Sequence, residues 1–222
     1  MIRLAYEPEH LYYSAVISSS SMITKKYIQS LFLTMFLLLM GISGCIMQES
    51  NDSKDNNDIS TETIDLSTIS LTKQDLPTQY TLLYENHTTE PTIQKNQTGN
   101  NITWQIEERY DATYYDINST DGVMQSILKL DTATNASNLT TLSKDNLLSY
   151  DYVQQEIDTI GEQSFFVYKN YSEKNVTYTY YTLIFTIDSL FIALAGSTET
   201  QNTFIEYAKI IEQRILDAAN IE

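Results

Sequence analysis

The sequence predicts an α+β domain in residues 69–222, with a mostly antiparallel sheet of about six strands and a C-terminal amphipathic helix packed on it. Three observations favour this class. Apolar and polar residues alternate along Trp104–Asp116, further strand-like runs separated by short polar turns lie between residues 164 and 195, and the last segment has a helical apolar stripe. A signal or anchor helix and a disordered stalk are expected before the domain.

The alternation of apolar and polar residues, together with turn residues, predicts the first strands of the domain. Tyr80–Tyr84 is the first predicted strand, and the polar segment Asn86–Asn101 after it predicts a long loop. In Trp104–Asp116 the two-residue period predicts one face on a core and the other in water. Met124–Leu130 is its expected partner strand, joined to it through the turn Asn118–Gly122.

A helix and two hairpins are expected next, followed by the C-terminal helix. Asp131 can cap a helix that runs to about Leu148, because a short carboxylate accepts bonds from the first free amides. The predicted strands are Ser164–Lys169, Thr177–Ile187 and Leu190–Ala195, with turns at Asn170–Asn175 and Asp188-Ser189. Thr198 or Thr200 then caps the helix Gln201–Ala218, whose stripe comprises Phe204, Ala208, Ile211, Ile215 and Ala218.

Residues 22–44 have the layout of an export signal. Lys25 and Lys26 precede a short apolar core, and small residues then lead to Cys45, the single cysteine of the chain. The alternative is an uncleaved anchor, for which the apolar run Leu31–Met47 is slightly short of the roughly 20 residues that span a bilayer. Both interpretations place the rest of the chain outside the cytoplasm and tethered, because the lysines stay on the cytoplasmic side.

Ile42-Ser43-Gly44-Cys45 resembles the lipobox of prokaryotic lipoproteins. The resemblance implies that Cys45 takes lipid on its sulfur and becomes the first residue after cleavage. Residues 1–21 contain mixed charges, unlike the basic start of a signal, so we expect translation to begin at Met22 and residues 1–21 to be a non-native extension.

Residues 45–68 are polar and predict a disordered linker. Their acidic cluster, Asp52, Asp55 and Asp58, lacks the glycine and the terminal glutamate of an EF-hand loop, so calcium binding is not expected there.

A second resemblance concerns the domain itself. Leu76-Pro77 before a strand, Ile160-Gly161-Glu162 before the hairpins, and a strand pair leading into an amphipathic C-terminal helix are similar to small exported lipoprotein domains with a PsbP/Mog1-like fold. No catalytic motif defines that group, so the resemblance implies a fold and a binding or scaffolding role.

Charge and cysteine content exclude several functions. The part from Cys45 onward has 27 acidic and 10 basic side chains, a net charge of about −17. Such a surface disfavours nucleic acid and anionic lipid headgroups as partners. With one cysteine, no disulfide forms within the chain, so its core alone must stabilise the domain.

Nine of the 15 asparagines lie in Asn-X-Ser/Thr, where composition alone would give about three. These candidate glycosylation sites, most of them expected in the stalk, loops and turns, are Asn51, Asn86, Asn96, Asn101, Asn118, Asn135, Asn138, Asn170 and Asn175. An Asn/Thr-rich surface with chance matches is the alternative. A lipobox with many sequons fits an archaeal surface lipoprotein better than a typical bacterial one.

The sequence contains few of the residues that catalytic sites commonly use. His87 is the sole imidazole after Cys45, and it lies in a predicted loop, so no Ser-His-Asp triad, zinc site, cofactor or catalytic residue is predicted. The carboxylates that could serve a glycosidase are Glu107, Glu108, Asp121, Glu156 and Asp158. Glu108 is unusual because the alternation puts it on the core side, which indicates either a β-bulge or a pocket.

These observations predict a membrane-anchored extracytoplasmic domain without enzymatic activity, which binds an extracellular ligand or protein partner or has an envelope role. Its 13 tyrosines from Tyr80 onward are expected in the core and at its rim, with a carbohydrate or peptide groove as the minority interpretation. The alternative function is a carboxylate-dependent enzyme acting on surface polysaccharide.

Overall fold

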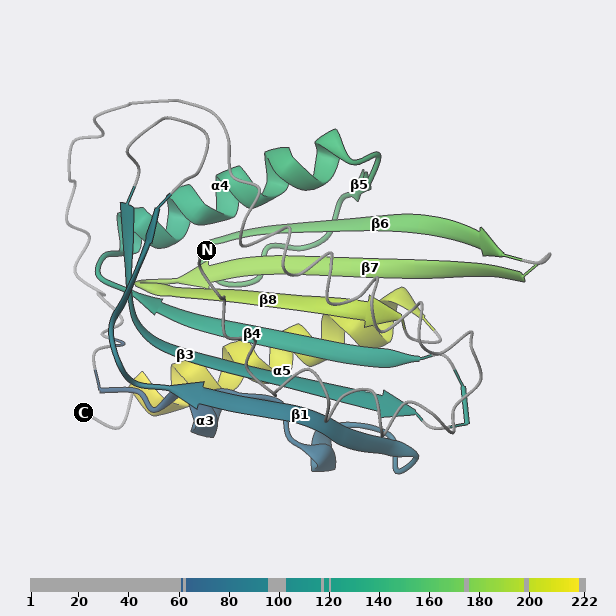
Figure 1. The fold of residues 1–222 in the computed structure, drawn as a ribbon, viewed down its shortest axis with the longest axis horizontal. Helices are drawn as coiled ribbons and strands as arrows, with labels where there is room; N and C mark the ends of the chain where they lie inside the picture. The colour runs from purple at the N-terminus through teal and green to yellow at the C-terminus, as the bar shows by residue number, and fades with distance from the viewer. Residues whose placement is uncertain are drawn as a thin grey trace, which may run out of the picture.

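The computed structural model describes residues 61, 63–95, 103–116, 118–119, 121–173, 176–197 and 200–219. In chain order the elements are α3 (Leu66–Ile69), η2 (Lys73–Asp75), β1 (Tyr80–Thr88), β2 (Thr92–Lys95), β3 (Thr103–Asp116), β4 (Gly122–Leu130), α4 (Ala133–Ser149), β5 (Val153–Gln155), β6 (Gln163–Glu173), β7 (Val176–Ile187), β8 (Leu190–Ser197) and α5 (Gln201–Ala219) (Figure 1). The predicted α+β class is confirmed. The predictions for residues 1–44, including the signal or anchor helix, lie outside the described residues. In the part of the chain that is described, no helix is both long and apolar enough to span a membrane.

The strands form one antiparallel sheet of eight strands in the described part of the chain, against about six predicted. Seven run in the order β1-β3-β4-β8-β7-β6-β5, and β2 continues the edge beyond β1 by pairing with another part of β3. The hairpin β3-β4 and the meander β6-β7-β8 meet where β4 pairs with β8. The segment with α4 and β5 therefore carries the chain from one half of the sheet to its far edge.

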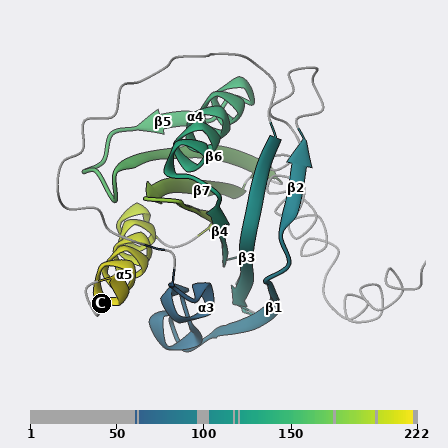
Figure 2. The same cartoon turned by 90° about the vertical axis from the view of Figure 1, so that its left-hand side faces the viewer.

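Helices cover both faces of this sheet. Phe204 and Ile211 of α5 pack on the face that contains Leu183 of β7. Leu139 of α4 packs on the opposite face, with the neighbouring strand residue Ile184. Figure 2 shows α4 and α5 on either side of β7. The packing of the C-terminal helix agrees with the prediction, and α4 adds a second layer.

A bulge in β3 changes which face its side chains occupy. The pairing of β3 with β4 shifts register between Ile106 and Glu108. Trp104 and Ile106 consequently pack with the α4 core, whereas Tyr110 and Tyr114 pack with the α5 core. The prediction that the apolar residues of this strand share one face is therefore wrong, because one extra residue reverses the alternation half-way along the strand.

The first edge of the sheet is longer than predicted. β1 continues through Asn86 to Thr88, and β2 lies within the segment Asn86–Asn101 that was expected to be a loop. Both strands pair with β3, which at 14 residues is long enough to accept two short partners in line. Polar composition predicted a loop here because an edge strand buries little of its surface.

The remaining boundaries differ by a few residues from the predictions. Thr132, rather than Asp131, caps α4, and its hydroxyl accepts a hydrogen bond from the Asn135 amide at 3.1 Å. Thr200 caps α5 by accepting from the Thr203 amide at 3.2 Å. β6 runs through Asn170 to Glu173, so these residues of the expected turn Asn170–Asn175 form a strand instead.

Candidate functional site

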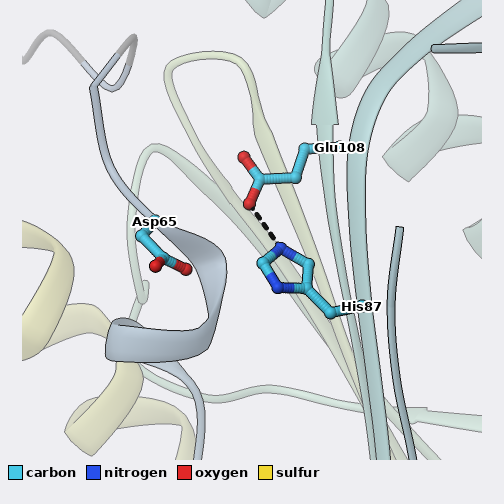
Figure 3. Close-up of side chains that lie close together, drawn as sticks. All are labelled: Asp65, His87 and Glu108. Atoms are coloured by element: carbon cyan, nitrogen blue, oxygen red, sulfur yellow. Dashed lines mark hydrogen bonds and ion pairs between the residues drawn. The ribbon is translucent and has the colours of Figure 1, made fainter. Parts of the chain in front are cut away.

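Three side chains with metal-ligating or proton-transferring groups meet beside the β1 edge of the sheet (Figure 3). They are Asp65, which precedes α3, His87 of β1 and Glu108 of β3. His87 Nε2 lies 2.7 Å from Glu108 Oε1. One ligand atom from each of the three residues lies within 4.8 Å of the other two. We call these three residues the Asp65–His87–Glu108 cluster.

The sheet register brings two members of the cluster together. His87 is paired with Tyr110 across β1 and β3, and Glu108 precedes Tyr110 by two residues, so both side chains emerge on the α5 face. The bulge gives Glu108 this orientation, because Ile106 lies on the opposite face. The ring of Tyr110 packs edge to face against the imidazole of His87, with the two ring centroids 5.8 Å apart.

The third member of the cluster, Asp65, lies near the start of the described chain. Asp65 caps α3, and its Oδ1 accepts hydrogen bonds from the amide of Ser67 at 2.9 Å and from its hydroxyl at 2.7 Å. The amide of Leu66 approaches Glu108 Oε1 at 3.4 Å, so α3 lies directly against the glutamate. Leu66 and Ile69 are buried in the α5 core, which holds this helix in place.

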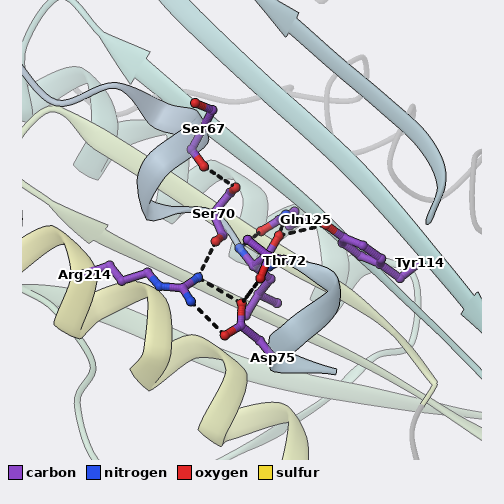
Figure 4. A network of polar contacts seen from close by, with 8 residues as sticks. Ser67, Ser70, Thr72, Asp75, Tyr114, Gln125 and Arg214 are labelled. Carbon is purple, nitrogen blue, oxygen red and sulfur yellow. Dashed lines mark hydrogen bonds and ion pairs between the residues drawn. The ribbon is translucent and has the colours of Figure 1, made fainter. Parts of the chain in front are cut away.

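A polar network fixes the chain after α3 and thereby positions Asp65 (Figure 4). Gln125 of β4 donates to the Leu71 carbonyl and accepts from the Leu71 amide, both at 2.8 Å. The hydroxyl of Tyr114 donates to the same carbonyl at 2.9 Å. Arg214 of α5 binds both carboxylate oxygens of Asp75, at 2.7 and 3.0 Å, and the Ser70 carbonyl.

The electrostatics of the cluster favour an ionised Asp65. Hydrogen bonds from the Ser67 hydroxyl and amide lower the pKa of Asp65. Burial, followed by the hydrogen bond that it donates to Glu85, raises the pKa of Tyr110, which stays a neutral phenol beneath His87. Lys129 lies opposite Glu108 in the register of β3 and β4. The side chains of His87 and Glu108 are 31% and 17% exposed, so one side of the cluster is open to solvent.

No protein-family model matches the chain, and no curated protein matches it. A solved structure, the extracellular domain of PknH from Mycobacterium tuberculosis, is similar at a TM-score of 0.41 and 11% identity, covering 71% of this chain and 95% of that one. At this level of similarity neither fold nor function is transferred from it.

The sequence singled out two members of the cluster and missed the third. Glu108 was expected at a bulge or in a pocket, and the bulge is confirmed. His87 lies in β1 rather than in the predicted loop. Asp65 belongs to the segment predicted as linker, but Thr61 and Leu66 are fully buried, so ordered structure begins before residue 69. An Asp before apolar residues is a helix N-cap signal that could have identified it.

The other predicted carboxylates lie elsewhere. Glu156 and Asp158 line one open hollow of about 420 Å³, together with Ile157, Gln201, Ile205 and Lys209. Both acids are exposed. Asp121 lies in the β3–β4 turn, where its carbonyl accepts from the Asp116 amide. Glu107 is exposed and is not part of the Asp65–His87–Glu108 cluster.

Five of the nine candidate glycosylation sites are described. Asn118 lies in a turn and is exposed, as predicted. Asn86, Asn135, Asn138 and Asn170 lie in β1, α4 or β6 instead of loops, although Asn138 and Asn170 are exposed there. Cys45, Asn51, Asn96, Asn101 and Asn175 lie outside the described residues.

Proposed function

We propose that this chain is a lipid-anchored domain on the extracytoplasmic side of the cell membrane, where it binds an extracellular ligand or protein partner without enzymatic activity. The observation that carries the proposal is the order of features in Lys25–Cys45: two lysines, an apolar core, small residues and the single cysteine. The many sequons support an archaeal cell surface as its location. The similarity of layout to PsbP/Mog1-like domains supports binding or scaffolding.

The geometry of the domain favours binding over catalysis. Apolar side chains fill both faces of the sheet where the helices cover it, and the acids Glu156 and Asp158 are exposed. The pKa of Asp65 and that of Asp75 lie below the ordinary value for aspartate, whereas a glycosidase acid needs a raised pKa. The imidazole of His87 faces a glutamate, with no serine in that contact.

Replacing Cys45 with serine tests the anchor. Cys45→Ser removes the sulfur that takes the lipid, so the domain should be released into the medium or remain as an uncleaved precursor. Membrane fractionation with immunoblotting measures this, and mass spectrometry of the N-terminal peptide of wild type should show lipid on Cys45. Ser50→Ala, five residues downstream, is the matched control and should stay membrane-bound. A mature-sized, membrane-retained C45S protein would contradict the proposal.

The second candidate function, an enzyme acting on surface polysaccharide, is favoured by one observation. Glu156 and Asp158 line the same hollow, which also contains the cation of Lys209. An enzyme of this kind would release reducing ends from purified surface polysaccharide, and Glu156→Gln or Asp158→Asn would lower that rate about 100-fold or more. The binding function predicts no turnover by wild type.

A further inference from the structure

The donor set of the Asp65–His87–Glu108 cluster is that of a metal site. It combines one imidazole nitrogen with two carboxylates, contributed by the N-cap of α3, by β1 and by β3. We propose that this cluster binds a divalent transition-metal ion of the zinc type, and that the ion fastens the start of the domain to the edge of its sheet. This site is independent of the anchor proposed above.

The spacing of the three donors suits a single ion. Ligand atoms bound to tetrahedral zinc at about 2.1 Å lie about 3.4 Å from each other. The pair His87 Nε2 and Glu108 Oε1 is closer, at 2.7 Å, and all three donors lie within 4.8 Å. Side-chain rotations that move these atoms by about an ångström therefore complete the site, and the backbone can stay as it is.

Neighbouring residues orient two of the three donors, Asp65 and His87. Ser67 engages Oδ1 of Asp65 with both its amide and its hydroxyl, so Oδ2 can bind the ion while those hydrogen bonds persist. The edge contact with Tyr110 orients the ring of His87, and the Tyr110 hydroxyl is itself tied to Glu85. Such supporting contacts are typical of ligand residues in metal sites.

The chemistry of the donors selects the class of ion. Imidazole suits zinc, copper, nickel and iron, whereas calcium requires six to eight oxygen ligands and magnesium retains most of its waters. Three protein ligands on a partly exposed site leave room for water in the remaining position. The two carboxylates of the cluster make the site attractive to a divalent cation.

The ion would connect segments that are far apart in sequence. Asp65 lies 22 residues before His87 and 43 before Glu108, and it precedes the α3 segment that packs on the α5 core. Coordination would tie Asp65 to both β1 and β3, beside the 3.4 Å contact of the Leu66 amide with Glu108. Because the unfolded chain does not hold the three donors together, binding stabilises the folded state.

The test uses the full chain in detergent, stripped with EDTA and titrated with zinc chloride in a calorimeter. We expect one saturable site, a rise of several degrees in Tm with zinc, and a matching loss of Tm when EDTA is added back. Asp65→Asn, His87→Gln and Glu108→Gln should each weaken zinc binding at least tenfold. Cobalt(II) in place of zinc should give visible absorption bands that His87→Gln shifts or abolishes.

Matched controls separate this site from adventitious binding. Asp217→Asn removes an exposed carboxylate remote from the cluster, and Glu107→Gln removes the carboxylate next to Glu108; both should bind zinc like wild type. Circular dichroism confirms that each variant is folded before titration. The proposal is overturned if folded wild type binds no zinc, if the three cluster variants bind as tightly as the controls, or if calcium or magnesium saturates the site as well as zinc.

Discussion

Asp75 has an unusually complete set of partners for a residue in a three-residue helix. Arg214 of α5 holds both its oxygens, and the amide and hydroxyl of Thr72 donate to Oδ2 at 2.7 and 2.9 Å. Burial alone would raise the pKa of Asp75, but these hydrogen bonds and the guanidinium charge outweigh that effect, so the pKa lies below the ordinary value for an aspartate. The residue therefore joins the first and last segments of the described chain.

Neutralising Asp75 should lower stability at neutral pH. Since the Asp75 side chain is 12% exposed and Arg214 is 31% exposed, loss of the charged pair in Asp75→Asn should cost about 2 kcal/mol, measured by urea denaturation at pH 7. Asp217→Asn, an exposed acid of α5, is the control and should stay within about 0.5 kcal/mol of wild type.

The same variant has a predictable pH dependence. A carboxylate whose folded pKa is depressed contributes stability above its unfolded pKa of about 3.9, and that contribution is lost as pH falls through the folded pKa. Wild type should thus lose its advantage over Asp75→Asn on acidification below about pH 4. An advantage that persists unchanged at pH 2 would show that the charge on Asp75 is not its source.

The candidate site could be predicted in part from single residues. Glu108 stands out in the sequence because it interrupts an alternation, and the physical cause is the bulge that turns it toward His87. The partnership itself required the register of β1 and β3, which a polar edge strand does not reveal in its sequence. Asp65 was hidden for another reason: a helix of four residues has too short an apolar pattern to separate it from a linker.

Among the elements, β3 depends most on a single inserted residue. The apolar side chains in the first half of β3 pack with the α4 core, and those in its second half pack with the α5 core. The change occurs at the bulge around Glu107. Trp104, the one tryptophan of the chain, is 3% exposed in the α4 core and so reports on this arrangement.

Deleting Glu107 should remove the bulge and leave both faces of β3 as they are. Ile106 pairs with Leu130 and Glu108 with Lys129, so without the extra residue Trp104 and Ile106 still face α4 while Tyr110 faces α5. We expect wild-type tryptophan emission from this variant. Inserting an alanine between Gln105 and Ile106 should instead turn Trp104 to the other face and red-shift its emission. Red-shifted emission in the deletion variant would contradict this account of the bulge.

The two strands that the sequence did not predict, β2 and β5, depend on pairing with a neighbouring strand. β2 and β5 have four and three residues, too few for a visible period, and form by pairing with β3 and β6. α4 was predicted, but its covering of the second face was not, because its buried side includes Thr140 and Ser143 beside Leu139 and Leu147. Long strands and α5 were predictable because their apolar spacing matches their burial.

For the whole molecule, repulsion among its excess negative charges opposes folding into a compact state. The chain carries a formal charge of −16, and no disulfide can hold it together. Burial on both faces of one sheet must therefore outweigh the repulsion among surface carboxylates. This balance depends on ionic strength, since the screening length falls from about 30 Å at 0.01 M salt to about 3 Å at 1 M.

Added sodium chloride should therefore stabilise the domain. We expect Tm to rise by several degrees between about 10 mM and 500 mM salt, measured by circular dichroism. A variant with three exposed acids neutralised, Glu90→Gln, Asp145→Asn and Glu206→Gln, should have a higher Tm at low salt and a smaller response. Equal salt responses in the two proteins would mean that general repulsion is not the cause.

The way in which residues 61–75 are attached also determines how the domain would respond to mechanical load. Thr61 is bound by Asp188, Leu71 by Gln125 and Tyr114, and Asp75 by Arg214, all through side chains. In a chain held at Cys45 and pulled at its bound partner, tension reaches these contacts one after another, before it reaches the backbone ladder between β4 and β8. The segment would come away before the strands separate, exposing the buried Leu66, Ile69 and Leu71, and would lengthen the tether while the sheet stays intact.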